Sequence, residues 1–312
     1  MTEIFRVEKK IGANNLILET GKIGKQADAA VIATYGETMV LAAVCSAPAK
    51  TEEIDYFPLN VEYRERLSAA GKFPGGFMKR EGSPSTKEIL TSRLIDRPIR
   101  PLFPDGYFDE VQITVNVISA DQDNDPDMVA MVAASAALSI SSIPFQGPIG
   151  AARLSRVDGQ FIINSTYAER EKSDFNLMLA GRRDAINMIE VDAKEIAENI
   201  AADGIAFAHK SIIDVCDLID ELVARCGKEK QVPQDNWDPA LADEIREKYS
   251  TQMQDAFTIT AKKQRNETLK AIADGIKELY CTEQDGKEPR CSSVLMGRII
   301  DSIQRQIVRK MI

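Results

Sequence analysis

The sequence feature that most constrains the fold is a change of pattern at Gly227. Before it, short strand-like runs separated by turn signals extend as far as Val191, with a few helical segments between them. The polar stretch GKEKQVPQDNWDPA follows, and it has the composition of a linker. After it only helical periodicity remains. We therefore expect an α+β domain at residues 1–230, built from hairpins packed with helices, and a small all-helical domain at residues 235–312.

Alternation and turn residues give the expected elements. Two β-rich segments meet at Gly36–Glu37, which predicts a hairpin. The other expected strands lie at 5–10, 15–19, 57–62, 111–118, 147–155, 160–164, 175–180 and 187–191. We expect a helix at 128–141 that carries small and apolar residues on all of its sides, which indicates burial on several sides. The remaining expected helices lie at 214–225, 239–257, 261–280 and 292–311.

Composition excludes several classes of protein. The N-terminus has no apolar signal segment, and the run from Met128 to Ile140 is too short to cross a bilayer. The five cysteines lack CxxC spacing, so we expect reduced, mostly buried thiols and a cytoplasmic protein without membrane contact. The single histidine, His209, follows an apolar run. We interpret it as a core or strand-end residue and not as a catalytic base.

Positive charge is concentrated in one stretch, although the protein as a whole carries a net charge of −9. Between Arg64 and Arg100 there are nine basic and four acidic residues. Folding does not require such segregation, whereas binding a polyanion does. The stretch is therefore a candidate nucleic-acid surface.

Glycines and Pro74 between Gly71 and Gly82 predict a loop, because they are too frequent for a helix or a strand. Its tip reads Phe77-Met78-Lys79-Arg80. Apolar side chains followed by cations suit single-stranded nucleic acid, because its bases can stack on the apolar groups while its phosphates contact the cations. The alternative is that Phe77 packs into the loop's own core and that the cations face solvent.

The helix after the loop begins with a capping box, Ser85 to Glu88, and ends near two prolines. It carries Arg93 and Arg97 four residues apart on one face, with Arg100 close by. Guanidinium groups suit phosphodiesters because they can donate two parallel hydrogen bonds. The alternative is a structural network in which Asp96 and Glu88 neutralise these arginines.

The segment GGFMKREGSPSTKEILTSRLIDRPIRPLFP resembles the corresponding segment of bacterial polynucleotide phosphorylases, with LIDRPIRPLFP intact at Leu94–Pro104. Further matches are LETGKIGKQADAAV at 18–31, DPDMVAMVAASAALSISSIPFQGPIGAAR at 125–153 and QRQIVRKMI near the end. The resemblance covers essentially the whole chain. It implies an RNase PH-like domain, then the family's all-helical domain, and a family activity that degrades RNA from its 3′ end with phosphate to nucleoside diphosphates.

The resemblance also implies where the chemistry lies. In the family a second RNase PH-like domain uses carboxylates to bind Mg²⁺ and small residues to hold inorganic phosphate, while the first is a degenerate copy that supplies RNA-binding and trimer surface. This chain has Asn176 where the active copy has a metal-binding Asp, and an amide is a weaker Mg²⁺ ligand. Met78 and Lys79 replace an aromatic residue and an arginine at the loop tip, so we expect a modestly weaker grip on RNA.

Three interpretations follow. The leading one is the N-terminal portion of a phosphorolytic exoribonuclease, with no catalytic or metal-binding residue of its own, acting on single-stranded RNA as a homotrimer with possible RNA-degradation partners. The uncapped last helix, ending at Ile312, favours a chain that belongs to a longer protein. The second interpretation is a non-catalytic RNA-binding and assembly module. The third is an unrelated α+β enzyme whose arginines bind a small anionic metabolite.

Overall fold

The computed structural model describes residues 3–49, 54, 56–77, 79–233, 236–283 and 288–312. They form two compact units. The larger unit holds all the strands and the helices α1 to α4, and the smaller unit holds the helices α5 to α7 together with short segments around Phe57 and Gly106–Phe108. This mixture of sheets and helices, followed by a purely helical region, confirms the α+β fold expected from the sequence.

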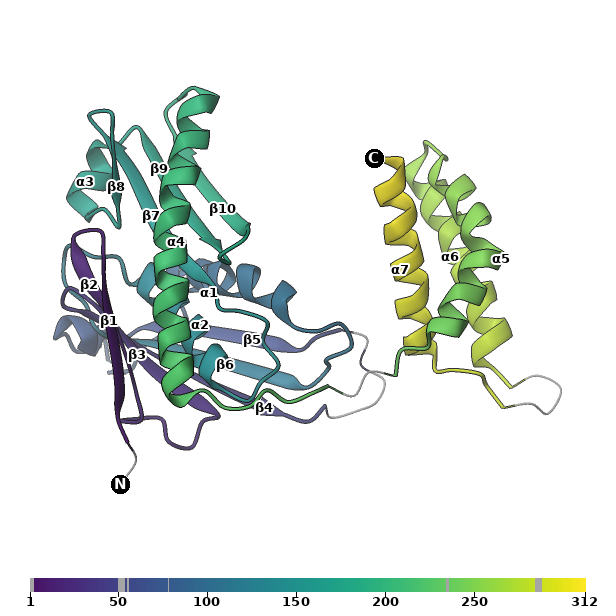
Figure 1. Ribbon diagram of the computed structural model, residues 1–312, viewed down its shortest axis with the longest axis horizontal. Coiled ribbons are helices and arrows are strands. Elements are labelled where there is room, and N and C mark those ends of the chain that lie inside the picture. Colours follow the sequence, from purple (N-terminus) through teal and green to yellow (C-terminus); the bar gives the residue numbers. More distant parts are fainter. Residues whose placement is uncertain (1–2, 50–53, 55, 78, 234–235, 284–287) are drawn as a thin grey trace. The chain divides into compact units, whose positions relative to one another are not determined.

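The larger unit begins with a mixed six-stranded sheet (Figure 1). Its strand order is β1-β2-β3-β4-β6-β5, with every neighbouring pair antiparallel except β5 and β6. The strands are β1 (Phe5–Ile11), β2 (Asn14–Thr20), β3 (Ala29–Tyr35), β4 (Thr38–Ala47), β5 (Leu59–Glu65) and β6 (Glu110–Ser119). The β3–β4 hairpin turns at Gly36, whose φ of +62° suits a residue without a Cβ atom.

Two helices connect this sheet to the rest of the unit. The parallel pair β5 and β6 requires a crossover, and the chain makes it through α1 (Thr86–Ile99), which packs on β5. After β6, α2 (Pro126–Ile140) begins at an Asp125 cap and packs against β3, β4, β7 and α4. Every residue of α2 is buried, as its all-round apolar sequence indicates.

A second, four-stranded sheet has the order β10-β9-β7-β8. Its strands are β7 (Gly150–Val157), β8 (Gln160–Ile163), β9 (Phe175–Gly181) and β10 (Ile186–Ala193), with the short α3 (Tyr167–Lys172) between β8 and β9. The long α4 (Glu198–Cys226) packs against β1, β7 and β9, so it joins the two sheets along one side (Figure 1).

The smaller unit is built on α5 (Pro239–Phe257), α6 (Lys262–Cys281) and α7 (Ser293–Met311). Asp238 caps α5 ahead of a proline at its first turn, and Ser292 caps α7. One continuous apolar core holds the three helices together, with Ile245, Met253 and Ile299 completely or almost completely buried. This unit thus has a hydrophobic core of its own.

Three expectations need correction. The helix expected at 214–225 is the second half of α4, which begins at Glu198. His209 lies within α4, and its Nε2 is 3.2 Å from the Arg182 carbonyl oxygen, so it is neither a core nor a strand-end residue. Of the five cysteines only Cys216 is buried, and Cys45 is exposed. No helix in the described residues is apolar and long enough to cross a bilayer.

A candidate RNA-binding surface

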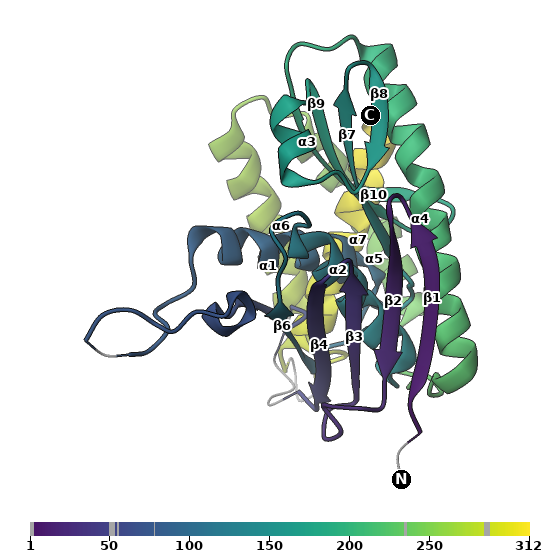
Figure 2. The same cartoon turned by 90° about the vertical axis from the view of Figure 1, so that its left-hand side faces the viewer.

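The loop between the 3₁₀ turn Leu67–Ala70 and α1 extends away from the sheet (Figure 2). Gly71 and Gly76 have φ values of +66° and +72°, conformations that glycine adopts at no steric cost. A Cβ atom added at either would meet nothing within 4 Å, so the glycines here serve backbone conformation and not close packing. The loop is therefore a projecting element, as its composition predicts.

The base of the loop is fixed by hydrogen bonds to Glu81. This carboxylate accepts one bond from Arg66 Nη1 at 2.7 Å and another from the Leu67 backbone N–H at 2.9 Å. The Arg66 hydrogen bond is the main reason why the pKa of Glu81 lies below its usual value. Arg64 Nη2 also donates to the Gly82 carbonyl oxygen at 3.0 Å. Two cations of the basic stretch thus hold the loop in place.

The capping box predicted at the start of α1 is present. Ser85 Oγ accepts from the Glu88 N–H at 3.2 Å, and Glu88 Oε2 accepts from the Ser85 N–H at 2.6 Å. The other oxygen of Glu88 accepts from the Glu65 N–H and lies 3.5 Å from Arg64 Nε. Glu88 therefore ties α1 to the end of β5, and it does not neutralise the arginines farther along the helix.

Two phenylalanines of the loop point into solvent. Phe77 is 99% exposed and Phe73 is 92% exposed. The alternative in which Phe77 packs into the loop's own core therefore does not describe this structure. Phe73 was not among the residues selected from the sequence, although its position between Lys72 and Pro74 in a breaker-rich loop was a signal for it. Exposed aromatic rings are the groups on which RNA bases stack.

Four cations of the basic stretch face solvent without an ion pair in the described part of the chain: Lys72, Lys79, Arg80 and Arg93. The first three are on the loop, and Arg93 is on the exposed face of α1. Lys79 has a φ of +51°, an uncommon conformation for a residue with a Cβ atom. Met78 lies outside the described residues.

Arg97 and Arg100 are also exposed but have partners. Arg97 Nη1 lies 3.2 Å from Glu190 Oε1 on β10, and both side chains are more than half exposed. Arg100 Nη2 is 2.6 Å from Asp96 Oδ1 and donates to the Leu59 carbonyl oxygen at 3.0 Å. The network expected as an alternative thus exists for Asp96 and Arg100. The exposed Arg97 pair contributes little to stability, so a polyanion could compete for that guanidinium, whereas Arg100 is held by two hydrogen bonds to Asp96, at 3.0 and 2.6 Å.

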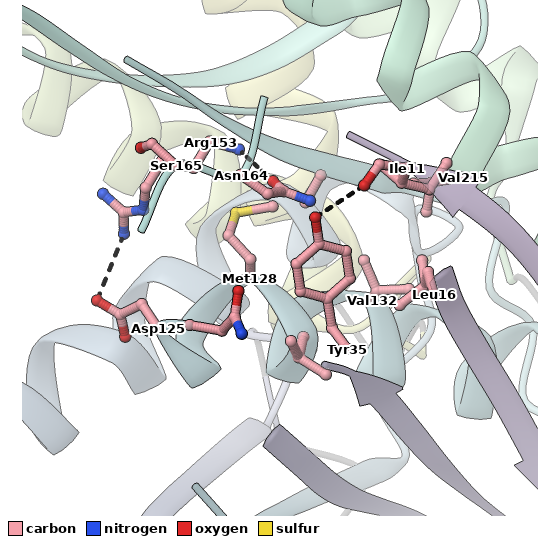
Figure 3. A pocket seen from close by; sticks show the side chains of 13 residues that line it. Ile11, Leu16, Tyr35, Asp125, Met128, Val132, Arg153, Asn164, Ser165 and Val215 are labelled. Carbon is pink, nitrogen blue, oxygen red and sulfur yellow. Dashed lines mark hydrogen bonds and ion pairs between the residues drawn. The ribbon is translucent and has the colours of Figure 1, made fainter. Parts of the chain in front are cut away.

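Lys87 is half-exposed, but its ammonium group is held by two carboxylates of the scaffold. Its Nζ lies 2.9 Å from Glu65 Oε1 and 3.4 Å from Asp125 Oδ1. Burial opposes its charge, but the hydrogen bond to Glu65 and the charge of Asp125 outweigh it and raise the pKa of Lys87. Asp125 also pairs with Arg170 at 3.0 Å, and Arg153 lies nearby (Figure 3). This cluster anchors α1 to the start of α2.

The pocket beside this cluster is small. It has a volume of about 20 Å³ between α2 and the first three strands, and Tyr35 donates a hydrogen bond to the Ile11 carbonyl oxygen at its edge (Figure 3). That is room for roughly one water molecule. The pocket therefore cannot admit a nucleotide in this conformation.

The surroundings of Asn176 do not suit a divalent metal. Asn176 Oδ1 accepts a hydrogen bond from Ser155 Oγ at 2.7 Å, and that hydroxyl is 2.5 Å from Ser165 Oγ. These neutral groups are occupied with one another, whereas Mg²⁺ is held chiefly by carboxylates and water. No cluster of three or more His, Cys, Asp or Glu side chains in the described residues could hold a metal ion.

Family models of known proteins match most of the chain. Residues 13–144 match the 3′ exoribonuclease family, domain 1, and residues 147–211 match its domain 2. Residues 240–312 match the polyribonucleotide nucleotidyltransferase RNA binding domain. The crystal structure of rice Rrp46 has a similar fold, with a TM-score of 0.56 and 15% identity, over 69% of this chain and 96% of that one.

Curated relatives align along the whole chain. The polyribonucleotide nucleotidyltransferase of Parvibaculum lavamentivorans is 44% identical over 100% of this chain and 43% of its own length. That of Persephonella marina is 43% identical over 98% of this chain and 43% of its own length. The chain thus spans less than half the length of these relatives. On these matches and on its fold, the chain belongs to the 3′ exoribonuclease family, in the group of the polyribonucleotide nucleotidyltransferases.

Proposed function

We propose that this chain supplies an RNA-gripping surface to a phosphate-dependent 3′-to-5′ exoribonuclease that degrades RNA to nucleoside diphosphates. The observation that carries the proposal is the projecting loop, where an almost fully exposed Phe77 is followed by the exposed cations Lys79 and Arg80. Keeping a large apolar ring in water has no benefit for folding, and single-stranded RNA offers it a stacking partner.

Each residue of the surface has a proposed role. Phe77 stacks on a base, together with Met78, while Lys79 and Arg80 bind phosphates at the RNA entrance. Arg93, Arg97 and Arg100 contact backbone phosphates or a neighbouring catalytic half. The hydrogen bonds of Glu81 hold the base of the loop and so restrict where the ring and the charges can lie, which lowers the entropic cost of binding.

Phosphate contacts can be tested by a salt titration with a labelled single-stranded RNA. On single strands the logarithm of the binding constant falls by about 0.7 per contact against the logarithm of salt concentration. Lys79→Ala/Arg80→Ala should reduce this slope by about 1.4, and equally for all RNA sequences, because phosphates carry no base information.

The matched control for this titration is Lys10→Ala/Lys25→Ala, which removes two exposed lysines. Lys10 lies on β1, at the opposite edge of the sheet from the strand that leads into the loop. Equal slopes for the two double variants would contradict the proposal. A shallow slope for the unmodified chain would instead favour a small anionic ligand.

Catalysis is proposed to lie in a second RNase PH-like domain of the enzyme, which would bind Mg²⁺ and inorganic phosphate. The neutral surroundings of Asn176 support this division, and they favour a non-catalytic RNA-binding and assembly role for the 312 residues by themselves. The purified chain should therefore release little or no nucleoside diphosphate from RNA and phosphate. Robust phosphorolysis by the chain alone would overturn this assignment, and adding a second RNase PH-like half should restore activity.

The family resemblance also leads us to propose a homotrimer, partners in RNA degradation, a role in mRNA catabolism and a cytoplasmic location. Sedimentation equilibrium of the purified chain tests the first of these directly. A sedimenting mass of three chains supports the trimer, and a mass near 34.5 kDa at micromolar concentration contradicts it for this chain.

A further inference from the structure

The segment that leaves the C-terminal end of α4 is fastened to the end of α2 (Figure 1). The Lys228 N–H donates to the Ile140 carbonyl oxygen at 3.0 Å, and the Gln231 N–H donates to the Ser142 carbonyl oxygen at 2.7 Å. We call residues 227–231 the strap. The larger unit ends two residues after it, so the strap fixes where the chain leaves that unit.

One side chain of the strap, that of Lys230, reaches the same helix end. Its Nζ donates to the Leu138 carbonyl oxygen at 2.7 Å and to the Ser141 carbonyl oxygen at 2.8 Å. It forms no ion pair with any residue that the structure describes. An ammonium group has three N–H donors, whereas a neutral amine has two and a lone pair. The two carbonyl oxygens therefore satisfy a neutral amine completely and leave its lone pair free.

The charged groups around Lys230 are engaged elsewhere. The chain from Met128 to Ala152, which includes almost all of α2 and the turn after it, contains no ionisable side chain. At the end of α4, Arg225 pairs with Glu221. No carboxylate in the described structure thus holds the Lys230 ammonium in its charged form.

Within the strap the neighbouring charges also leave Lys230 alone. Lys228 Nζ donates to the Asp28 carbonyl oxygen, and the Glu229 side chain is exposed. The carbonyl groups at a helix C-terminus favour a cation, but burial outweighs them and lowers the pKa of Lys230 to about 8. About a quarter of this side chain is then neutral at pH 7.5, against roughly 0.1% of an ordinary lysine.

A neutral lysine amine is a nucleophile, and the site restricts which electrophile suits it. Carbon dioxide would give a carbamate, an anion that would lie against two carbonyl oxygens. An acyl donor gives an uncharged amide that keeps one N–H donor, so it fits a site made of carbonyl groups. Lys230 is partly exposed, which favours a small donor such as an acyl phosphate over a large one.

We propose that Lys230 is an acylation site for small acyl phosphates, and that its acylation loosens the strap. The Nζ lone pair attacks the acyl carbonyl carbon, the bond from that carbon to the phosphate oxygen breaks, and inorganic phosphate leaves while the nitrogen gives a proton to water. The amide has one N–H where the amine had two, so one of the two carbonyl oxygens loses its lysine donor. The strap then keeps only its backbone hydrogen bonds to the end of α2.

The first test is reactivity. The intact chain is treated with acetyl phosphate between pH 7 and 10, and acetylation of Lys230 and of Lys228 is measured by mass spectrometry. Lys228 is the matched site, because it is exposed and lies two residues away. Lys230 should react several-fold faster at pH 7.5, and its rate should level off above about pH 9, whereas that of Nα-acetyl-lysine in the same tube keeps rising. Lys230 reacting no faster than Lys228 would overturn the proposal.

The second test is the consequence for the strap. Lys230→Arg is the matched control, since it keeps a charged donor and cannot be acylated at this position. After the same treatment, hydrogen exchange of residues 227–233 should become several-fold faster in the unmodified sequence and stay unchanged in Lys230→Arg. Acylation of the other lysines occurs in both chains and so cancels in this comparison. Equal changes in both chains, or no change in either, would show that acylation of Lys230 does not loosen the strap.

Discussion

Replacing Phe77 by Ala should separate RNA binding from stability. Because the ring is 99% exposed, its removal takes no apolar area out of the core. The free energy of unfolding should therefore change by less than about 0.5 kcal/mol, as for surface substitutions generally. Loss of one base-stacking contact costs about 1–3 kcal/mol. RNA affinity should fall roughly 5- to 150-fold, since 1.4 kcal/mol corresponds to a factor of about ten.

The assay for Phe77→Ala is fluorescence anisotropy with labelled oligoadenylate and oligouridylate, alongside urea unfolding of the same preparations. Phe77→Tyr is the matched control, because it keeps the aromatic ring and should keep the affinity. Phe73→Ala measures the contribution of the second exposed ring. Unchanged affinity in Phe77→Ala, or a clear loss of stability, would refute the reasoning that this ring is held in solvent for RNA.

Three further predictions concern the scaffold. Gly150→Ala should destabilise the chain by at least about 1–3 kcal/mol in urea unfolding, because the added Cβ atom would lie 2.3 Å from the Ile212 carbonyl oxygen. Asp125→Asn should cost about 3 kcal/mol, because Arg170 is mostly buried and loses its paired carboxylate, whereas Lys87 keeps Glu65. Burial raises the pKa of Asp125, but its cationic neighbours outweigh burial and hold it below 3.8, so the stabilisation exists above that pH and is lost as pH falls through the folded-state value. If the free energy of unfolding changed equally little between pH 5 and pH 2 in the unmodified chain and in Asp125→Asn, this account of Asp125 would be contradicted. Cys281 and Cys291, with sulfur atoms 3.6 Å apart, should form a disulfide in oxidised glutathione, slowly because burial raises the pKa of Cys291 to about 12. Mass spectrometry of peptides prepared without reduction detects this disulfide. If both thiols still react with an alkylating reagent after oxidation, the prediction is contradicted.

The strands were predictable because one-sided burial leaves a period of two in the sequence. The first half of α4 was missed for a physical reason. Gly204 reads as a helix breaker, but a Cβ atom there would lie 2.8 Å from the Phe175 ring. The glycine is thus explained by close packing of α4 on β9, which the sequence of α4 alone does not reveal.

The sequence was enough to predict the loop of the candidate site, but not which of its cations form ion pairs within the protein. Glycines and Pro74 predict the loop, and the loop is present. The use of Arg66 and Lys87 as structural cations was not predictable, because their partners Glu81 and Asp125 come from other elements. Only the fold brings them together, so a count of basic residues in the sequence overstates the cations available to RNA.

The most direct test of the central claim is photo-crosslinking of 4-thiouridine-labelled single-stranded RNA to the intact chain, with the crosslinked peptides identified by mass spectrometry. The account predicts crosslinks within residues 72–80, at or beside Phe73 and Phe77, and their loss on competition with unlabelled RNA. Specific crosslinks confined to other surfaces, with none in this loop, would contradict it.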